Sequence, residues 1–151
     1  MKRIAYLLVA GSMVLTACNN EPAYKIVGIA EGIADGETVY LQEVQGRDLI
    51  NLDSAVVNKG TFTFKGRQDS AVNRYITYMT DGTRMMADLF LENGDINVTL
   101  GEDSRATGTP NNDIYQEFKD KFVTYNQEMG ELYQKARTDS TLTNEQREEL
   151  M

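Results

Sequence analysis

Short runs of β-forming residues, separated by turn signals, set the fold that this chain of 151 residues can adopt. The clearest run is Thr61-Phe62-Thr63-Phe64-Lys65, in which Phe62 and Phe64 alternate with polar residues. Successive side chains of a strand point to opposite faces of its sheet. The segment therefore predicts a strand with one buried face and one face in solvent.

Six more segments between residues 24 and 100 have a similar β-rich character. They are 24–30, 38–44, 52–57, 73–79, 84–92 and 95–100. Turn signals lie between them, and Asp35-Gly36 and Asn93-Gly94 are each expected to close a hairpin. No helical segment is available for a parallel crossover. About seven strands with short turns predict a mainly β fold, an antiparallel sandwich or barrel, and of these two we expect the antiparallel β-sandwich.

The hydrophobic period changes after Gly108. Pro110 suits the first turn of a helix, where its missing N–H is not needed, and Thr109 can cap that turn. Apolar residues then recur at spacings of three and four, which predicts a long amphipathic helix over 111–137. We expect its face to pack on the sheet through Tyr115, Phe118, Phe122 and Tyr125.

A short second helix is expected after Thr143. Thr143 and Gln146 have the spacing of a capping box, in which each side chain bonds the backbone N–H of the other. Two helical turns do not hold together alone in water, and the sequence reaches Met151 without a C-cap. We therefore expect the natural chain to continue beyond Met151.

The N-terminus reads as a bacterial lipoprotein signal. Lys2 and Arg3 precede an apolar run over 4–15, which ends in Leu15-Thr16-Ala17-Cys18. The run falls short of the roughly 20 apolar residues that span a bilayer. These features predict a signal peptide over 1–17 and a lipid on Cys18, the only cysteine. A tether would follow over 18–23, then a β-sandwich over 24–108 and a helical region over 109–151.

That assignment places the mature chain in the cell envelope, anchored by lipid to a membrane and facing the periplasm or the cell surface.

The composition limits the kinds of catalytic and metal site that the chain can form, because it has no histidine and no second cysteine. Imidazole catalysis, an internal disulfide, a Cys-x-x-Cys pair and a thiolate zinc site are thereby excluded. A formal charge of −8 argues against nucleic acid as a partner. We predict no cofactor, no metal and no catalytic residue in this chain.

Several segments together resemble a known family. They are Gly28 with Val39-Tyr40-Leu41; Leu52-Asp53-Ser54 with Val57, Gly60, Phe62, Phe64 and Gly66; Leu91-Glu92-Asn93-Gly94 with Ile96 and Val98; and Gly108-Thr109 with Asn112, Tyr115 and Phe118. Their order and spacing over about residues 24–122 resemble domain of unknown function 4369. This is the β-rich domain at the N-terminus of many Bacteroidetes-type lipoproteins.

In that family the domain usually precedes a thioredoxin-like domain of the thiol:disulfide interchange or peroxiredoxin-like kind. The resemblance implies that the helical region is the connector and that the redox motif would lie beyond Met151. It thus implies a non-catalytic, lipid-anchored module of an envelope oxidoreductase. The roles open to such a module are anchoring, substrate docking or formation of a homodimer, with the thioredoxin-like domain or a redox protein as partner.

Two other functions remain open from the residues alone. A stand-alone lipoprotein that binds a glycan, peptide or small molecule would line a cleft with tyrosines, whereas the same tyrosines could fill the core. The candidates are Tyr40, Tyr75, Tyr78, Tyr115 and Tyr125.

A carboxylate hydrolase would use Asp53 and Asp69, but their spacing supports no shared site. The acidic residues Asp35, Glu37, Asp95, Glu102 and Asp103 lack the spacing of a calcium-binding loop.

Two tripeptides resemble the O-glycosylation acceptor of Bacteroidetes-type periplasmic proteins. They are Asp53-Ser54-Ala55 and Asp69-Ser70-Ala71. Ser54 is predicted in a strand, where burial would block modification, and Ser70 in a loop. An intact mass equal to lipid plus polypeptide would contradict modification at Ser70.

Overall fold

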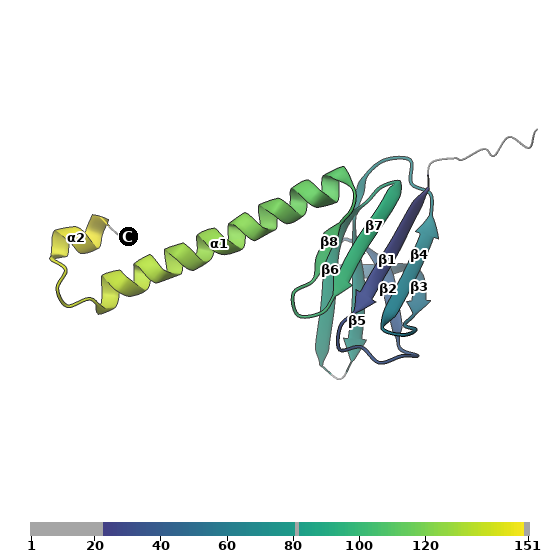
Figure 1. The fold of residues 1–151 in the computed structure, drawn as a ribbon, viewed down its shortest axis with the longest axis horizontal. Coiled ribbons are helices and arrows are strands. Elements are labelled where there is room, and N and C mark those ends of the chain that lie inside the picture. Colours follow the sequence, from purple (N-terminus) through teal and green to yellow (C-terminus); the bar gives the residue numbers. More distant parts are fainter. Residues whose placement is uncertain (1–22, 81, 150–151) are drawn as a thin grey trace, which may run out of the picture.

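The computed structural model describes residues 23–80 and 82–149. The signal segment and Cys18 lie outside the described residues. The described chain forms two four-stranded sheets followed by a long and a short helix (Figure 1). The first sheet has the order β4-β1-β7-β8 and the second the order β3-β2-β5-β6. The predicted β-sandwich with a helical extension is confirmed.

The strands and helices have the following bounds. They are β1 (Tyr24–Ala30), β2 (Thr38–Gln45), β3 (Asp48–Val56), β4 (Thr61–Gly66), β5 (Val72–Thr80), β6 (Thr83–Leu91), β7 (Gly94–Leu100), β8 (Arg105–Thr107), α1 (Pro110–Thr138) and α2 (Asn144–Glu149). All seven predicted strands are present within a few residues of their expected bounds. β8 was not predicted, since three residues are too few to show an alternation.

Two predicted hairpins are wrong. β1 pairs with β4 and β7, and β2 pairs with β3 and β5, so Asp35-Gly36 lies in a crossing between the sheets. Asn93-Gly94 likewise connects β6 of the second sheet to β7 of the first. A turn signal requires the chain to change direction, but it does not require the next strand to pair with the last.

The expectation of purely antiparallel pairing is also wrong at one place. β1 and β7 are parallel, from Tyr24 opposite Gly94 to Ala30 opposite Leu100. The chain returns from β1 to β7 through strands of the facing sheet, mainly β2, β5 and β6, and these take the place that a crossover helix has in α/β folds. The remaining strand pairs are antiparallel.

The core lies between the two sheets and follows the alternation of the strands. In β4, Phe62 and Phe64 are buried while the threonines between and beside them are exposed, as predicted. The buried hydrophobic residues are Ile26, Ala30, Ile33, Val39, Leu41, Val57, Phe62, Phe64, Ile76, Tyr78, Ala87, Leu89, Leu91, Ile96, Val98, Leu100 and Ala106. Every one of them comes from the sandwich, so the core is complete without a side chain from α1.

Helix α1 projects away from one edge of the sandwich (Figure 1). The predicted packing of its aromatic face on the sheet is wrong for three of the four residues, because Phe118, Phe122 and Tyr125 are 60, 54 and 57% exposed. The residues of α1 that are buried near the sandwich are Asn112 and Gln116, which are polar. Helical periodicity identifies an apolar face, but it does not say what that face packs against.

Helix α2 lies against the far end of α1. Ala136 is buried there, and the Arg147 guanidinium donates hydrogen bonds of 2.6 Å to the backbone oxygens of Ala136 and Asp139. The capping box is confirmed: the Thr143 N–H donates to Gln146 Oε1 at 2.9 Å, and the Gln146 N–H to Thr143 Oγ1 at 3.3 Å. Among the described residues, neither helix is both long enough and apolar enough to cross a bilayer.

Candidate functional site at the joint between sandwich and helix

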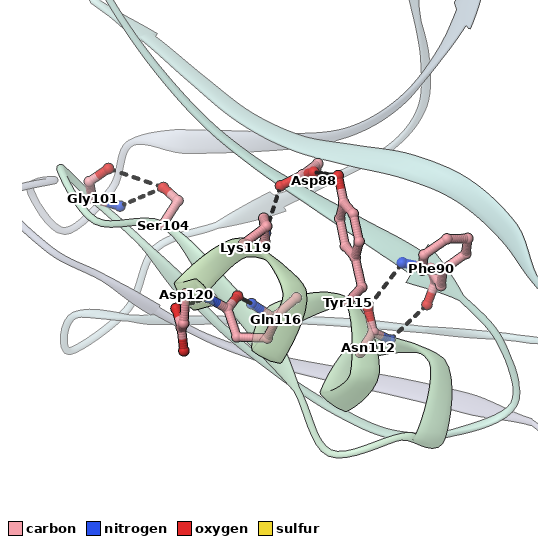
Figure 2. A network of polar contacts seen from close by, with 10 residues as sticks. Asp88, Phe90, Gly101, Ser104, Asn112, Tyr115, Gln116, Lys119 and Asp120 are labelled. Atoms are coloured by element: carbon pink, nitrogen blue, oxygen red, sulfur yellow. Dashed lines mark hydrogen bonds and ion pairs between the residues drawn. The ribbon is translucent and has the colours of Figure 1, made fainter. Parts of the chain in front are cut away.

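The first three turns of α1 are held to the sandwich by polar side chains, and we call this contact the joint (Figure 2). Asn112 lies at its centre and is 1% exposed. Its Oδ1 accepts from the Phe90 N–H and its Nδ2 donates to the Phe90 C=O, both at 2.8 Å, and Nδ2 also donates to Thr109 Oγ1. Phe90 belongs to β6, an edge strand of the second sheet. Asn112 thus bonds backbone groups that a further strand would otherwise pair.

A second cluster joins the next helical turn to the same strand. Asp88 of β6 accepts hydrogen bonds from the Tyr115 hydroxyl at 2.6 Å and from Lys119 Nζ at 2.8 Å (Figure 2). Lys119 Nζ also lies 4.8 Å from the centre of the Tyr115 ring, and the Phe90 ring meets that ring edge-on. One carboxylate therefore fixes two side chains of α1, and the aromatic contacts fix the rotation of the helix.

The pKa values of Tyr115 and Asp88 agree with a structural role for this cluster rather than a catalytic one. The hydrogen bond to Asp88, together with burial, raises the pKa of Tyr115 to about 12. Burial raises the pKa of Asp88, but the hydrogen bonds from Lys119 and Tyr115 outweigh it and leave that pKa below its usual value. At neutral pH the phenol is protonated and the carboxylate is charged. A tyrosine that acts as a base or nucleophile needs the opposite shift.

The joint also reaches the first sheet. Gln116 is buried, and its Oε1 lies 3.4 Å from the backbone N–H of Ala106 in β8, while its Nε2 donates to Asp120 at 2.9 Å. Asp120 in turn forms an ion pair with Arg105 of β8. Because β6 and β8 are edge strands of different sheets, α1 bridges the two layers at one edge of the sandwich.

Gly108 shapes the entry into the joint. Its φ of +100° lies in the region that only glycine adopts freely, and a Cβ there would lie 2.5 Å from the Asp95 carbonyl oxygen. Its N–H donates to Asp113 Oδ1 at 2.7 Å. The backbone can therefore turn sharply from β8 into the helix.

Ala23, the first described residue of the chain, lies at the same end of the sandwich. The Ala23 C=O accepts a hydrogen bond of 3.0 Å from the Gly94 N–H, and a Cβ on Gly94 would lie 2.8 Å from the Thr109 side chain. Thr109 is the residue that precedes α1. Ala23, the last residue of the predicted tether, and Thr109 at the start of the helix thus both lie beside Gly94.

The two predicted glycosylation sites are both accessible. Ser54 lies in β3 and is exposed, contrary to the expected burial, and Ser70 is exposed in the segment before β5. Asp53 and Asp69 are exposed as well, and no interaction between them is found in the described part of the chain. Modification at either serine stays a prediction.

The five tyrosines do not gather around one cleft. Tyr78 is in the core, Tyr75 lies on β5 opposite Asp88 of β6, Tyr115 is in the joint and Tyr125 is in solvent. Tyr40 lines a shallow depression on the outer face of the second sheet, together with Gln42, Arg47, Asn51, Thr77 and Arg84. Over residues 23–80 and 82–149, no group of three or more carboxylate, histidine or cysteine side chains is placed to hold a metal ion.

Sequence reasoning missed Asp88 and Lys119 as parts of a site, and it gave Asn112 no role. Asn112 and Gln116 are spaced by four residues at the start of the helix, which puts them on one face. That face is polar, and a polar face of a helix ordinarily predicts a surface in contact with solvent. Two amide residues spaced by four look the same in the sequence whether their side chains are buried or exposed.

The acid dependence of folding should report on Asp88. Its pKa is lowered in the folded chain and returns to 3.8 on unfolding. The stabilisation is therefore complete above about pH 5 and is lost as the pH falls below about 4, through the folded-state pKa. The free energy of unfolding of Asp88→Asn should fall less steeply with acid than that of the wild type. Asp103→Asn, which changes an exposed carboxylate, is the control, and equal slopes for all three proteins would contradict the role of Asp88.

Comparison with known proteins gives one match. No curated protein and no solved structure matches the chain. The family described as Domain of unknown function (DUF4369) matches residues 24–115, more than half of the chain. The matched range begins at the first residue of β1 and ends at Tyr115 in the joint. The chain therefore belongs to the DUF4369 family.

Proposed function

We propose that this chain is a non-catalytic, lipid-anchored module of an envelope thiol:disulfide oxidoreductase, with α1 as the element that leads to the redox partner. The observation that carries the proposal is the direction of α1. The helix is held by a polar joint at its first turns and leaves the sandwich with its aromatic residues in solvent. A helix that belonged to the fold would bury that face.

The arrangement of the joint supports an orienting role. Five side chains of α1 bond to β6 or β8, so the start of the helix is fixed in direction and rotation. The lipid proposed on Cys18 would hold the sandwich at the end where α1 begins, because Ala23 bonds to Gly94, and Gly94 lies against the Thr109 side chain. Helix and membrane would then be close together, as a membrane-bound holder of another domain requires.

The residues available in the chain support the non-catalytic part of the proposal. A dithiol–disulfide reaction needs two cysteines, and the chain has one. The raised pKa of Tyr115, due to its hydrogen bond to Asp88, keeps the phenol protonated. The thiol chemistry would have to come from the thioredoxin-like domain or from a separate redox protein.

A second candidate function is a stand-alone binding lipoprotein, and one feature favours it. The depression around Tyr40 combines a half-buried aromatic ring with amide side chains, the cations Arg47 and Arg84 and the carboxylate of Asp48. Such a surface suits a polar ligand such as a glycan or a short acidic peptide. It is shallow, and it lies on an outer face that no helix covers.

The mass of the native, membrane-extracted protein distinguishes the two functions. The first predicts a diacylglycerol-modified Cys18 and a polypeptide about twice this length with a Cys-x-x-Cys beyond Met151. A lipidated product that ends at Met151 would contradict the oxidoreductase module and favour the binding lipoprotein. The Cys18→Ser variant is the control, and it should carry no lipid.

A further inference from the structure

Seven of the apolar residues of α1 follow a heptad pattern. Tyr115, Phe122, Met129 and Ala136 are spaced by seven residues, and so are Phe118, Tyr125 and Leu132, which alternate with them. These seven residues form a stripe along the helix, which we call the seam. Their mean spacing of 3.5 residues is that of positions a and d in a left-handed coiled coil.

The seam is covered at both ends and open in the middle. Tyr115 is packed in the joint and Ala136 is buried at the end where α2 lies. Between them, Phe118, Phe122 and Tyr125 are more than half exposed, and Leu132 is 38% exposed. The rings of Phe118 and Phe122 stack on each other, with centres 6.1 Å apart, and present one continuous apolar surface.

Helix α1 has little to hold it together beyond the joint. Of its 29 residues, 18 lie past Asp120, and most of the stability of a helix in a protein comes from packing of its apolar face rather than from propensity. This part includes Gly130 and the β-formers Val123, Thr124 and Tyr125, which lower helix propensity. A helix of this composition requires packing on its apolar face to persist.

We propose that the seam pairs with the seam of a second copy of this chain in an antiparallel, two-helix coiled coil. In the register that we infer, Phe118 packs beside Met129 of the other copy and Phe122 beside Tyr125. Tyr115 then lies beside Leu132, so every exposed seam residue gains an apolar neighbour. The proposal rests on the function proposed above only in that the lipid holds both copies to one membrane.

Charges next to the seam select this orientation and register. Lys121 and Glu128 occupy successive g positions, which face each other across an antiparallel pair. In the proposed register Lys121 lies opposite Glu128 of the other copy, and the twofold symmetry makes this ion pair twice. A shift by one heptad toward the C-terminus would put Lys121 opposite Lys135 and Glu128 opposite itself. A parallel pair would place Lys121 opposite Asn126, with no charge complement.

Lys121 can leave its present ion pair for Glu128 of the other copy at little cost. Its present partner is Glu117, one helical turn away, and both side chains are largely exposed at 75 and 66%. Exposed pairs within one helix contribute little. Glu117 lies at a c position, outside the seam.

The area of the seam suits copies that share a membrane. Aromatic side chains bury of the order of 150–250 Å² when fully covered, and those of the seam are about half exposed. Pairing would therefore cover of the order of 1,000 Å² in total, near the lower limit for a specific interface. Confinement to one membrane raises the effective concentration and favours such a pair.

Disulfide trapping in the lipid-anchored product of the 151-residue sequence tests the arrangement. In the proposed pair, residues 118 and 129 of different copies are neighbours. The two positions are about 16 Å apart within one helix, too far for a disulfide. The double variant Phe118→Cys/Met129→Cys should give a covalent dimer in membranes under mild oxidation. Each single variant should stay monomeric on a non-reducing gel.

Two results would overturn the proposal. Dimers from either single variant would show a parallel pair, and a monomeric double variant would show that the seam has another partner. Neither result would alter the lipid or the polypeptide length found by mass, so failure here is distinct from failure of the proposed function.

Charge reversal checks the register in the same double-cysteine background. Lys121→Glu should lower the dimer yield roughly tenfold, because two attractive pairs become repulsive. Adding Glu128→Lys should restore the yield. Glu131→Lys makes the same charge change as Glu128→Lys, but at a c position outside the seam. Added to Lys121→Glu in place of Glu128→Lys, it should leave the lowered yield unchanged. A restored pair that crosslinks no better than Lys121→Glu alone would contradict the register.

Discussion

Replacing Gly28 by alanine is expected to lower the free energy of unfolding by about 3 kcal/mol or more. Gly28 lies in the middle of β1 opposite Phe62 of β4. The Phe62 ring covers it so closely that a Cβ would lie 1.9 Å from Cζ. Ring and backbone would both have to move, and the ring is enclosed by the core.

Urea unfolding of the purified chain, followed by circular dichroism, measures this loss. Phe62→Leu in the Gly28→Ala background removes the obstructing ring, so the double variant should lose less stability than the sum of the two single variants. Gly130→Ala is the matched control, because no atom outside α1 lies within 4 Å of its Cβ position. It should stabilise the helix by up to about 1 kcal/mol. A Gly28→Ala variant as stable as the wild type would contradict the close contact.

Asn112→Ala should detach the start of α1 from the sandwich. The change leaves the Phe90 N–H, the Phe90 C=O and the Thr109 hydroxyl without the partners that Asn112 supplies. Unpaired groups of this kind cost about 1–3 kcal/mol each when they are buried. Water can reach an edge strand, so we expect a loss of about 2–3 kcal/mol, concentrated in the joint.

Hydrogen exchange at the Phe90 amide measures that loss directly. In Asn112→Ala the exchange should become roughly 30- to 160-fold faster, the factor that corresponds to about 2–3 kcal/mol. Asn111→Ala is the control, since its bonds to Glu92 are exposed and its loss should leave Phe90 protected. Equal protection in Asn112→Ala and wild type would show that the amide does not hold the strand.

Local features of the fold could be predicted from the sequence. The alternation of Phe62 and Phe64 predicted the buried face of β4, because side-chain direction in a strand depends on neighbours in sequence. Lys59-Gly60 is a tight turn in which both residues have positive φ, at +51° and +69°. The capping box at Thr143 is equally local.

The pairing of strands could not be predicted in the same way. Asp35-Gly36 and Asn93-Gly94 indicated turns correctly but not the sheet in which the next strand lies. The parallel pair of β1 and β7 joins segments about 70 residues apart in the chain. Which distant strands meet depends on how both inner faces fill one core, and no short segment holds that information.

The site was the least predictable part. The aromatic period of α1 was recognised, but the residues that attach the helix are Asn112 and Gln116 on a polar face. Asp88 is a carboxylate in a strand between buried residues, and its two partners lie 27 and 31 residues further along. Such long-range polar contacts leave no periodic signal.

The central claim is that α1 stands clear of the sandwich and offers its aromatic face to a partner. The most direct test is the thermal unfolding midpoint of the sandwich in the Phe118→Asp/Phe122→Asp variant, at a concentration low enough to keep the copies apart. Because both rings are more than half exposed, the midpoint should stay within about 2 °C of wild type. A fall of about 10 °C or more would mean that these rings are buried against the sheet, and it would contradict the account.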